Sequence, residues 1–402
     1  MAATSKTNYT STVRTKYLQK LIKTASGYLV AHRFAAKQKV ERGAGDTIRV
    51  NKILRPAKTT ATSAEGTLVA AASATNLVTN FQEFELENWG NSFGFNEDVE
   101  ITSFISDAQN REVIARQMAQ SLEKALQAKL GTGGMRWRID KDTEYQRQGT
   151  ATANSTTVLL ESGNTFVITD ADMDGGYVTI INPDGPNYDI TSQMADTTAT
   201  TADTAAVVFP QACTADSNFI ATVGTGIAAT DVLTTTALMD MSGHHELFET
   251  EKFSDNGGYR MFMHAAQHRD LWNDTTFLNS AIYDNSGRFK NYKVGRWFDI
   301  EFLVSSELYR EDVDGTTNAA GVVYVSPVFG ANAYNVYQFA QPGGSGAFGV
   351  TFYTVDTPDS GNLRNSAKYL SWKGHFAAGV TRATSCIGLM TGATSMGLNV
   401  TD

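Results

Sequence analysis

The sequence predicts an α+β fold, and three features of the chain indicate it. Residues 46–54 and 80–99 alternate apolar and polar side chains, as half-buried strands do. Residues 102–130 carry apolar side chains at the three- and four-residue spacing of one helix face. Beyond residue 236, strand-like and helix-like segments are interspersed. Strands mixed with helices in this way are typical of the α+β class.

Length and composition exclude several classes of protein. The chain has 402 residues, 42% of them apolar and 19% charged, which suits two or three domains with buried cores. No apolar run approaches the roughly 18 residues that cross a bilayer. The polar N-terminal residues lack the apolar segment of a secretory signal, and the two cysteines, Cys213 and Cys386, form neither a disulfide framework nor a CxxC zinc pair. We therefore expect a chain that does not enter membranes.

Charge is distributed unevenly along the chain. The net charge is −9, but the first 60 residues hold thirteen Lys and Arg against two acids, a balance of +11. Residues 148–235 hold ten acids and no Lys, Arg or His, a balance of −10. The basic segment is equally explained by a solvated face or acidic partner, and by a surface that meets nucleic acid or a neighbouring subunit.

The N-terminal third predicts helical pieces and an extended arm. Apolar spacing over residues 13–40 favours one or two helices, broken near Gly27. The alternating segments 46–54 and 80–99 flank a stretch rich in small residues, 56–76. A compact domain rarely needs some 20 residues without structure, whereas a two-stranded arm that packs on another chain does.

The clearest element is a long helix over residues 102–130. Ser103 or Ser106 can cap its start, and the run Gly131–Gly134 ends it. At about 1.5 Å per residue the helix spans roughly 40 Å, which is long for a globular protein.

The remaining chain divides into a β-rich insert and a mixed body. Thr, Ala, Ser, Asp and Gly dominate residues 148–235, which predicts an all-β insert with an acidic, solvent-facing surface. Its expected strands are Thr157–Leu160, Thr165–Thr169, Tyr177–Ile181 and Ala205–Phe209. In the body, helices are predicted over 236–248 and 264–281. The predicted body strands are 259–263, 298–304, 321–325 and 369–384, while 331–339 fits either state.

Residues that could carry chemistry are few. Asp170, Asp172 and Asp174 are spaced like the start of a calcium loop, but Ile181 stands where an EF-hand needs Glu. Three such carboxylates can hold a structural Ca²⁺, and an acidic β-turn explains them equally well. His264 and His268 lie one helical turn apart without an obvious third metal ligand. Cys386 lies in an apolar stretch and is expected to be a buried thiol. Nothing indicates an enzyme or a cofactor.

The order of segments resembles a known family. Its matching stretches are Gly45–Val50, Ala64–Gly66, Glu97–Ile101, Phe262–His264, His268–Leu271, Lys293–Arg296 and Phe302–Ser306. They resemble the major capsid proteins of tailed phages with the Hong Kong 97-type fold. The texture is closest to the Enquatrovirus-like (N-four-like) podophage coat proteins. The resemblance covers residues 13–135 and about 236–390, and leaves 140–235 outside it.

The resemblance implies a layout for the whole chain. Its parts would be an N-terminal arm (1–45), an extended two-stranded loop (46–98), a peripheral domain with the spine helix 103–130 (99–139), the acidic β-rich insertion domain (140–235), a peripheral return (236–254), an axial domain (255–365) and a C-terminal peripheral strand and tail (366–402). The insertion domain would project outward.

The resemblance also implies a function and its partners. The chain would be a non-enzymatic capsid subunit that assembles with itself, as pentamers and hexamers, into an icosahedral shell in the host cytoplasm. Its other partners would be the portal, a scaffolding or cement protein, and packaged dsDNA on the inner face of the virion. The arm and the extended loop would contact neighbouring subunits through Arg14, Lys16, Lys20, Lys58, Glu65 and Trp89.

Two other functions remain open from the residues. A tail or fibre protein, or a surface-decoration protein, would use the Thr- and Asp-rich insert to bind a glycan or receptor, but it would not need the long loop and spine helix. A calcium-dependent hydrolase rests on the three aspartates alone and lacks a nucleophile–base set.

Overall fold

The computed structural model describes most of the predicted elements. The described residues are 30–40, 47–53, 79–96, 107–141, 146–150, 176–181, 188–193, 218–222, 227–255, 257–278, 295–312, 322–339, 351–355 and 367–394. The chain divides into two compact units. The first combines Met1–Ile48, Phe84–Leu126 and Asn335–Ala378, and the second combines Arg49–Glu83, Gln127–Tyr334 and Gly379–Asp402. Both units contain helices and sheets, which confirms the α+β class.

The first unit is built on a five-stranded sheet. Its strands are β1 (Ala36–Val40), β4 (Glu87–Asn96), β15 (Tyr334–Phe339), β16 (Thr351–Val355) and β17 (Ala367–Val380). The order is β1-β15-β17-β16, and β4 also pairs with β17. The β4–β17 ladder is antiparallel and runs from Glu87 opposite Phe376 to Asn96 opposite Ala367.

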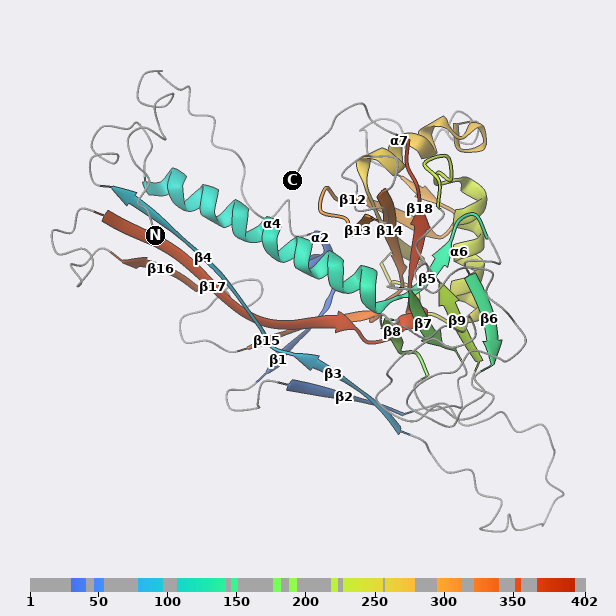
Figure 1. Cartoon of the computed structure of the whole chain (residues 1–402), viewed down its shortest axis with the longest axis horizontal. Coiled ribbons are helices and arrows are strands. Elements are labelled where there is room, and N and C mark those ends of the chain that lie inside the picture. The colour runs from blue at the N-terminus through green and yellow to red at the C-terminus, as the bar shows by residue number, and fades with distance from the viewer. Residues whose placement is uncertain are drawn as a thin grey trace, which may run out of the picture. The chain divides into compact units, whose positions relative to one another are not determined.

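Helix α4 (Asp107–Gly133) runs alongside β4 and β17 (Figure 1). The helix predicted over 103–130 is therefore confirmed, with its end three residues later. Its buried face consists of Ile114, Met118, Leu122, Ala125, Leu126 and Leu130. Two polar contacts fix its neighbours. Both carboxylate oxygens of Glu123 accept from the backbone N–H of Ala31 at 2.9 and 3.1 Å, which ties the short helix α2 (Val30–Phe34) to α4.

The second unit contains a seven-stranded mixed sheet. Its strands are β5 (Met135–Arg138), β10 (Tyr259–Met263), β11 (Arg296–Trp297), β12 (Ile300–Val304), β13 (Arg310–Asp312), β14 (Val322–Phe329) and β18 (Cys386–Thr391). The order is β11-β12-β10-β14-β18-β5, with β13 on β14. Helices α6 (Thr235–Leu247) and α7 (Ala265–Asn273) supply apolar residues to the same buried core as β10 and β12. Burial of these apolar side chains stabilises the packing of the helices on the sheet.

A smaller four-stranded sheet lies in the region expected to be the insert. It consists of β6 (Gln146–Thr150), β7 (Tyr177–Ile180), β8 (Thr191–Gln193) and β9 (Asn218–Thr222), in the order β6-β9-β7-β8. Strands β7 and β9 contact β5 of the larger sheet, and Ile220 shares its core. These described strands therefore pack into the second unit, and the limits proposed for a separate insertion domain stay a prediction.

The predicted two-stranded arm is present at its base. Strand β2 (Thr47–Ile53) pairs with β3 (Thr79–Glu85) in a sheet of their own. The chain then continues as β4, which pairs with β17 instead. The tip, residues 56–76, lies outside the described residues.

Two local expectations need correction, and one assignment that was open between helix and strand is decided. Residues 36–40 form strand β1 rather than helix, because they pair in parallel with β15. Residues 334–339, which fitted either state, are that partner strand. The strand predicted over 369–384 is present as β17, but it ends at Val380. It is not the last strand, because a short 3-10 turn at Ala383–Ser385 leads into β18.

Candidate functional site

The two helix-spaced histidines stabilise α7 rather than form a metal pair. His264 caps the helix, with Nδ1 accepting from the backbone N–H of Ala266 at 3.2 Å. His268 Nε2 accepts from the indole N–H of Trp272 at 2.6 Å. Within the described residues, no group of three or more His, Cys, Asp or Glu side chains could hold a metal ion. The part of the chain that is described also has no helix both long and apolar enough to span a membrane.

Cys386 is a buried thiol, as expected. It is fully buried at the start of β18, and burial raises its pKa to about 12. The thiol is therefore protonated at neutral pH and is a poor nucleophile.

Most of the predicted site residues lie outside the described residues. This holds for the calcium candidates Asp170, Asp172 and Asp174, and for the predicted contact residues Arg14, Lys16, Lys20, Lys58 and Glu65. Trp89 is described, as is the base of the arm that carries the predicted contact tip. Two candidate contact regions therefore remain, each considered by itself. They are the arm base, formed by β2 and β3, and strand β4, which carries Trp89.

Charged side chains make contacts at both ends of the arm base. Arg49 on β2 pairs with Glu83 on β3 at 2.6 Å, and its guanidinium lies 4.1 Å from the centre of the Phe81 ring. Both charged side chains are about half exposed, so the pair adds little stability but fixes which strand faces match. Lys52, at the other end of β2, donates to the backbone carbonyl of Asp189 at 3.3 Å. Burial lowers the pKa of Lys52.

Asp189 is the polar centre to which the arm base is attached. Its buried carboxylate accepts from the backbone N–H and the hydroxyl of Thr384, at 2.5 and 2.6 Å, and lies 3.3 Å from Arg382. Its backbone has φ of 65°, a left-handed conformation that Asp tolerates better than most residues. Asp189 therefore joins the arm, the four-stranded sheet and the C-terminal strand segment.

Arg136 connects the two sheets of the second unit. The side chain is buried on β5, where Nη1 pairs with Glu311 at 2.5 Å and Nε donates to the Gly131 carbonyl at 3.1 Å. The guanidinium lies 3.6 Å from the centre of the Tyr177 ring on β7. Neither Asp189 nor Arg136 was among the residues predicted from the sequence. A signal was present only for Arg136, as the alternation of Met135, Trp137 and Ile139 with charged residues.

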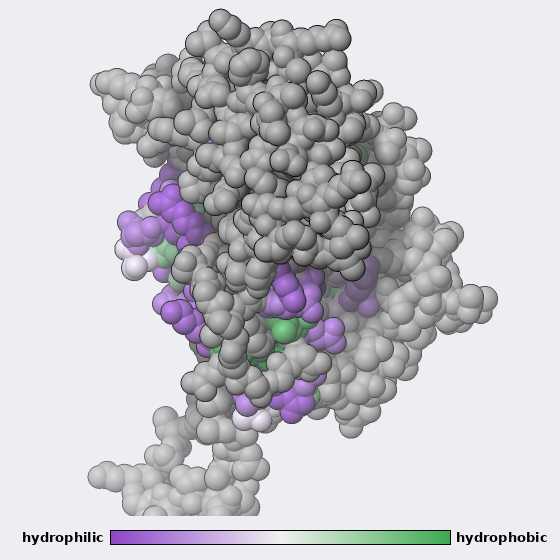
Figure 2. All heavy atoms as spheres, turned by 90° about the vertical axis from the view of Figure 1, so that its left-hand side faces the viewer, coloured by the Kyte–Doolittle hydropathy of each residue, from purple (hydrophilic) through white to green (hydrophobic). Residues whose placement is uncertain are grey.

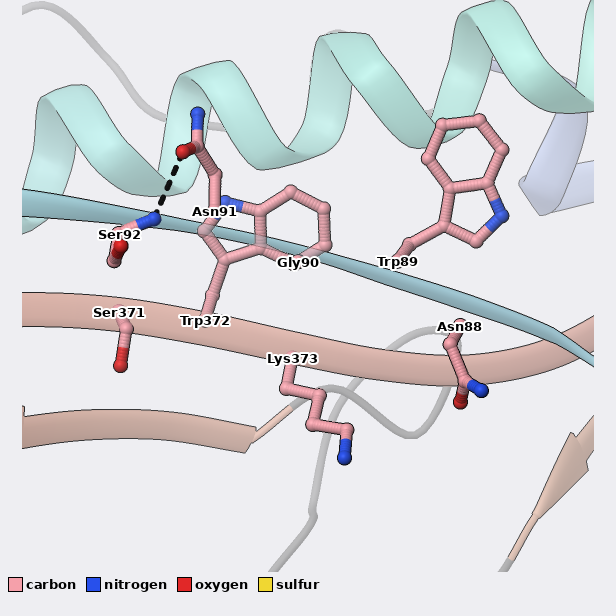
Figure 3. A pocket seen from close by; sticks show the side chains of 8 residues that line it. All are labelled: Asn88, Trp89, Gly90, Asn91, Ser92, Ser371, Trp372 and Lys373. Carbon is pink, nitrogen blue, oxygen red and sulfur yellow. Dashed lines mark hydrogen bonds between the residues drawn. The ribbon is translucent and has the colours of Figure 1, made fainter. Parts of the chain in front are cut away.

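Trp89 lies beside an open hollow on the β4–β17 ladder. The hollow has a volume of about 490 Å³ and is lined by Asn88, Trp89, Gly90, Asn91, Ser92, Ser371, Trp372 and Lys373. Figure 3 shows Trp89, Asn91 and Trp372 directed to the side of α4, and Asn88, Ser371 and Lys373 directed to the opposite side. Trp372 is fixed there by a hydrogen bond from its indole N–H to Gln117 Oε1 at 3.0 Å.

Trp89 as a residue is partly buried. Its indole N–H donates to Glu87 Oε2 at 3.0 Å, and the ring stacks on Phe376 with a centroid distance of 6.2 Å. These two contacts fix the orientation of Trp89, although the residue is not fully buried. Large, rigid and partly exposed aromatic rings are typical anchors of protein contacts.

The opposite side of this ladder is polar. Cross-strand pairs include Ser92 opposite Ser371, Gly90 opposite Lys373 and Asn88 opposite His375. Figure 2 shows one face of the molecule, on which the described residues in view are mostly hydrophilic, with small hydrophobic areas between them. Small and polar side chains on a sheet face suit a wet contact rather than a small-molecule pocket, which is usually concave and apolar.

Comparison with known proteins identifies the fold. No protein-family model matches the chain, and no curated protein matches it in sequence. Its structure is similar to the "Capsid of Ralstonia phage GP4", with a TM-score of 0.55, 12% identity and 96% of each chain covered. It is also similar to the "Cyanophage Pam1 capsid asymmetric unit" (TM-score 0.53, 12% identity, 95% of this chain and 97% of that chain). A third similar structure is the "Capsid structure of the Cyanophage P-SCSP1u", with a TM-score of 0.52 and 11% identity. That match covers 95% of this chain and 93% of the other chain. The chain therefore has an α+β phage capsid fold over nearly its whole length.

Proposed function

We propose that this chain is the major capsid protein of a tailed dsDNA bacteriophage, which assembles with itself into an icosahedral shell. The observation that carries the proposal is the length of the structural match. Between 95% and 96% of this chain aligns with three capsid proteins, and 93% to 97% of each of those chains is covered in return. Shared elements alone are found in unrelated folds, whereas an end-to-end match of this kind includes the order and connection of the elements.

The elements themselves support an assembly role. The two-stranded arm has its own sheet and leads to a tip rich in small residues, which lose little side-chain entropy when a neighbour orders them. The long helix α4 and the five-stranded sheet give the first unit a rigid body. In this proposal the fold is the Hong Kong 97 type, and the arm contacts the adjacent subunit. The nearest phage group stays a prediction.

The proposal extends to partners and location. Pentamers and hexamers of the chain form the virion shell, and the portal and a scaffolding or cement protein complete it in the host cytoplasm. The +11 balance of the first 60 residues suits non-specific contact with packaged DNA. The protein acts through geometry and needs no catalytic residue or cofactor, and a calcium ion at Asp170, Asp172 and Asp174 would be structural.

Electron microscopy of the full-length chain tests the proposal. Negative-stain images at moderate salt should show rings, sheets or closed shells, because heterologous contacts that repeat around an axis close into rings. Discrete monomers or slender trimers under all conditions would contradict the capsid function. Slender trimers would instead favour a fibre protein, and a glycan-binding screen would then follow.

A further inference from the structure

The short helix α2 (Val30–Phe34) is held in the first unit by few buried side chains. Ala31 and His32 are its buried residues, and His32, with 6% of the residue exposed, has the larger side chain. A helix of five residues is not stable alone, because its few hydrogen bonds do not offset the entropy lost in nucleation. The docked position of α2 therefore depends largely on the contacts of these two residues.

Two hydrogen bonds join α2 to its neighbours in the first unit. The backbone N–H of Ala31 donates to the buried Glu123 carboxylate of α4, at 2.9 and 3.1 Å, and Figure 1 shows α2 beside that helix. The side-chain amide of Gln338 on β15 donates to His32 Nε2 at 3.0 Å. An amide N–H can only donate, so Nε2 is the acceptor and carries no proton. The second contact therefore requires a neutral imidazole ring.

The surroundings of His32 oppose a proton on its ring. Burial first, and then the charge of Lys37 on β1, lower the pKa of His32 from 6.5 to about 4. If the Gln338 amide turned its oxygen to a protonated ring, the imidazolium would still be buried beside Lys37. A proton therefore binds the docked helix much more weakly than a helix whose ring is in water.

The other titratable groups near α2 do not supply a partner for an imidazolium. Strand β15 contributes tyrosines only, which are neutral below pH 7. The Glu123 carboxylate already accepts from Ala31. The charged groups next to α2 are Arg33 on the helix itself, Lys37 and Lys39 on β1, and, on α4, Glu123 and its neighbour Lys124.

We propose that α2 is a pH-dependent switch, which leaves α4 and β15 when His32 takes up a proton and docks again when the proton is lost. Undocking moves the ring into water, where the imidazolium is hydrated. The pairing of β1 with β15 uses backbone groups, so it remains when α2 leaves. The opening is therefore local, and it does not depend on the proposed capsid function.

The switch acts in the pH range between the two pKa values of His32. Above pH 6.5 the ring is neutral in both forms, and docking is strongest. Below pH 6.5 the undocked form gains a proton that the docked form does not bind until the pH nears 4. Docking therefore weakens as the pH falls. For these two pKa values, the ratio of undocked to docked α2 should rise about twentyfold from pH 7 to pH 5.

Hydrogen–deuterium exchange of the full-length chain tests the switch. Each exchange rate is divided by the intrinsic rate at the same pH, so that protection can be compared between pH 7 and pH 5. The amides of Val30–Phe34 should lose about twentyfold in protection, while those of β17 in the same unit change far less. Unchanged protection of α2, or an equal loss in α2 and β17, would overturn the proposal.

Substitution of the histidine shows whether its proton is the cause. In His32→Gln the new amide oxygen accepts from Gln338 and takes no proton, so protection of α2 should be the same at pH 7 and pH 5. His375→Gln is the matched control, because it removes a histidine of β17 that lies opposite Asn88. The control should keep the acid response of wild type. A full acid response in His32→Gln would show that another group is responsible.

A second variant leaves the histidine in place and changes its partner. Gln338→Glu offers a carboxylate to the protonated ring, so α2 should stay docked at pH 5 and its loss of protection should shrink. This result does not depend on how well His32→Gln preserves the helix. A wild-type loss of protection in Gln338→Glu would contradict the proposal.

Discussion

Asp189 shows how one buried carboxylate organises the second unit. It binds Thr384 and Arg382 through its side chain and Lys52 through its carbonyl. We predict that Asp189→Asn lowers the free energy of unfolding by about 1–3 kcal/mol, because a hydrogen-bond acceptor and a charge are lost inside the protein. Asn also tolerates the left-handed backbone, so the substitution tests the side chain alone.

Denaturant unfolding measures this loss, and Glu83→Gln is the matched control. Glu83 also pairs with an arginine, but both side chains are about half exposed. The control should change stability by less than about 1 kcal/mol. Equal effects of the two substitutions would mean that Asp189 does not hold the unit together.

His245 predicts how acid destabilises the second unit. Its ring is fully buried, stacks on Tyr259, and contacts Thr250 Oγ1 at 3.2 Å and the Val328 carbonyl at 3.1 Å. Burial lowers its pKa from 6.5 to about 3. Below pH 6.5 the His245 ring is therefore protonated in the unfolded chain but stays neutral in the folded chain. The free energy of unfolding is therefore unaffected by this group above pH 6.5. Below that pH it falls by up to about 1.4 kcal/mol per pH unit.

Thermal unfolding between pH 7 and pH 5 tests this dependence. His245→Gln should be less stable at pH 7, yet it should lose less stability on acidification than wild type. The prediction is wrong if both proteins lose the same amount, since other groups would then be responsible.

The residues that were not predicted from the sequence are charged side chains that are buried, whereas charged side chains usually face solvent. Arg136 and Arg138 are buried on the four-residue strand β5, although arginines normally indicate solvent. Asp189 was counted with the solvent-facing acids of the insert, and only 2% of it is exposed. Arg136 and Asp189 are buried against partners from distant parts of the chain, Glu311 and Thr384. Arg138 pairs instead with Asp140, two residues further along the chain.

At the scale of elements, alanine substitutions of two glycines should have opposite effects on stability, one through strand packing and the other through helix propensity. A Cβ on Gly90 of β4 would lie 2.8 Å from the Trp372 carbonyl, so Gly90→Ala should push β4 away from β17. We expect it to cost about 1–3 kcal/mol through overpacking. Gly243 lies in α6 with nothing within 4 Å of such a Cβ. Gly243→Ala should therefore add up to about 1 kcal/mol, the helix propensity of Ala over Gly.

Circular-dichroism melting curves of the two variants provide the comparison. A lower melting temperature is expected for Gly90→Ala and a higher one for Gly243→Ala. Similar shifts in the same direction would argue against the close packing of β4 on β17.

Elements with strong local periodicity were predicted well, and those defined by their partners were not. Helix α6 and strand β10 lie within a residue of their expected limits. Strand β1 was expected to be helical, since AKQKV has little strand character and forms a strand only by pairing with β15. Strand β18 was missed because CIGLMT is a short apolar run that periodicity cannot assign.

At the scale of the whole molecule, the arm tip should matter for assembly and not for folding. We predict that replacing residues 59–76 with a short Gly-Ser linker leaves the melting temperature unchanged, because the β2–β3 pairing and the Lys52 contact hold the arm base without the tip. Rings and shells should be lost, because a tip that lies over a neighbour is then absent. Light scattering and electron microscopy measure the outcome. Normal assembly of the shortened chain would exclude the tip as a contact.

The sequence by itself determined the fold class, the arm, the long helix and the uneven charge, because each depends on residues close together in the chain. Tertiary structure alone decided how the chain is divided. Each unit combines three separate stretches, and β4 leaves the arm to pair with β17. It also decided that the described strands of the insert pack against β5. The physical reason is that pairing between distant strands, and burial of charged groups against distant partners, depend on contacts that local patterns do not encode.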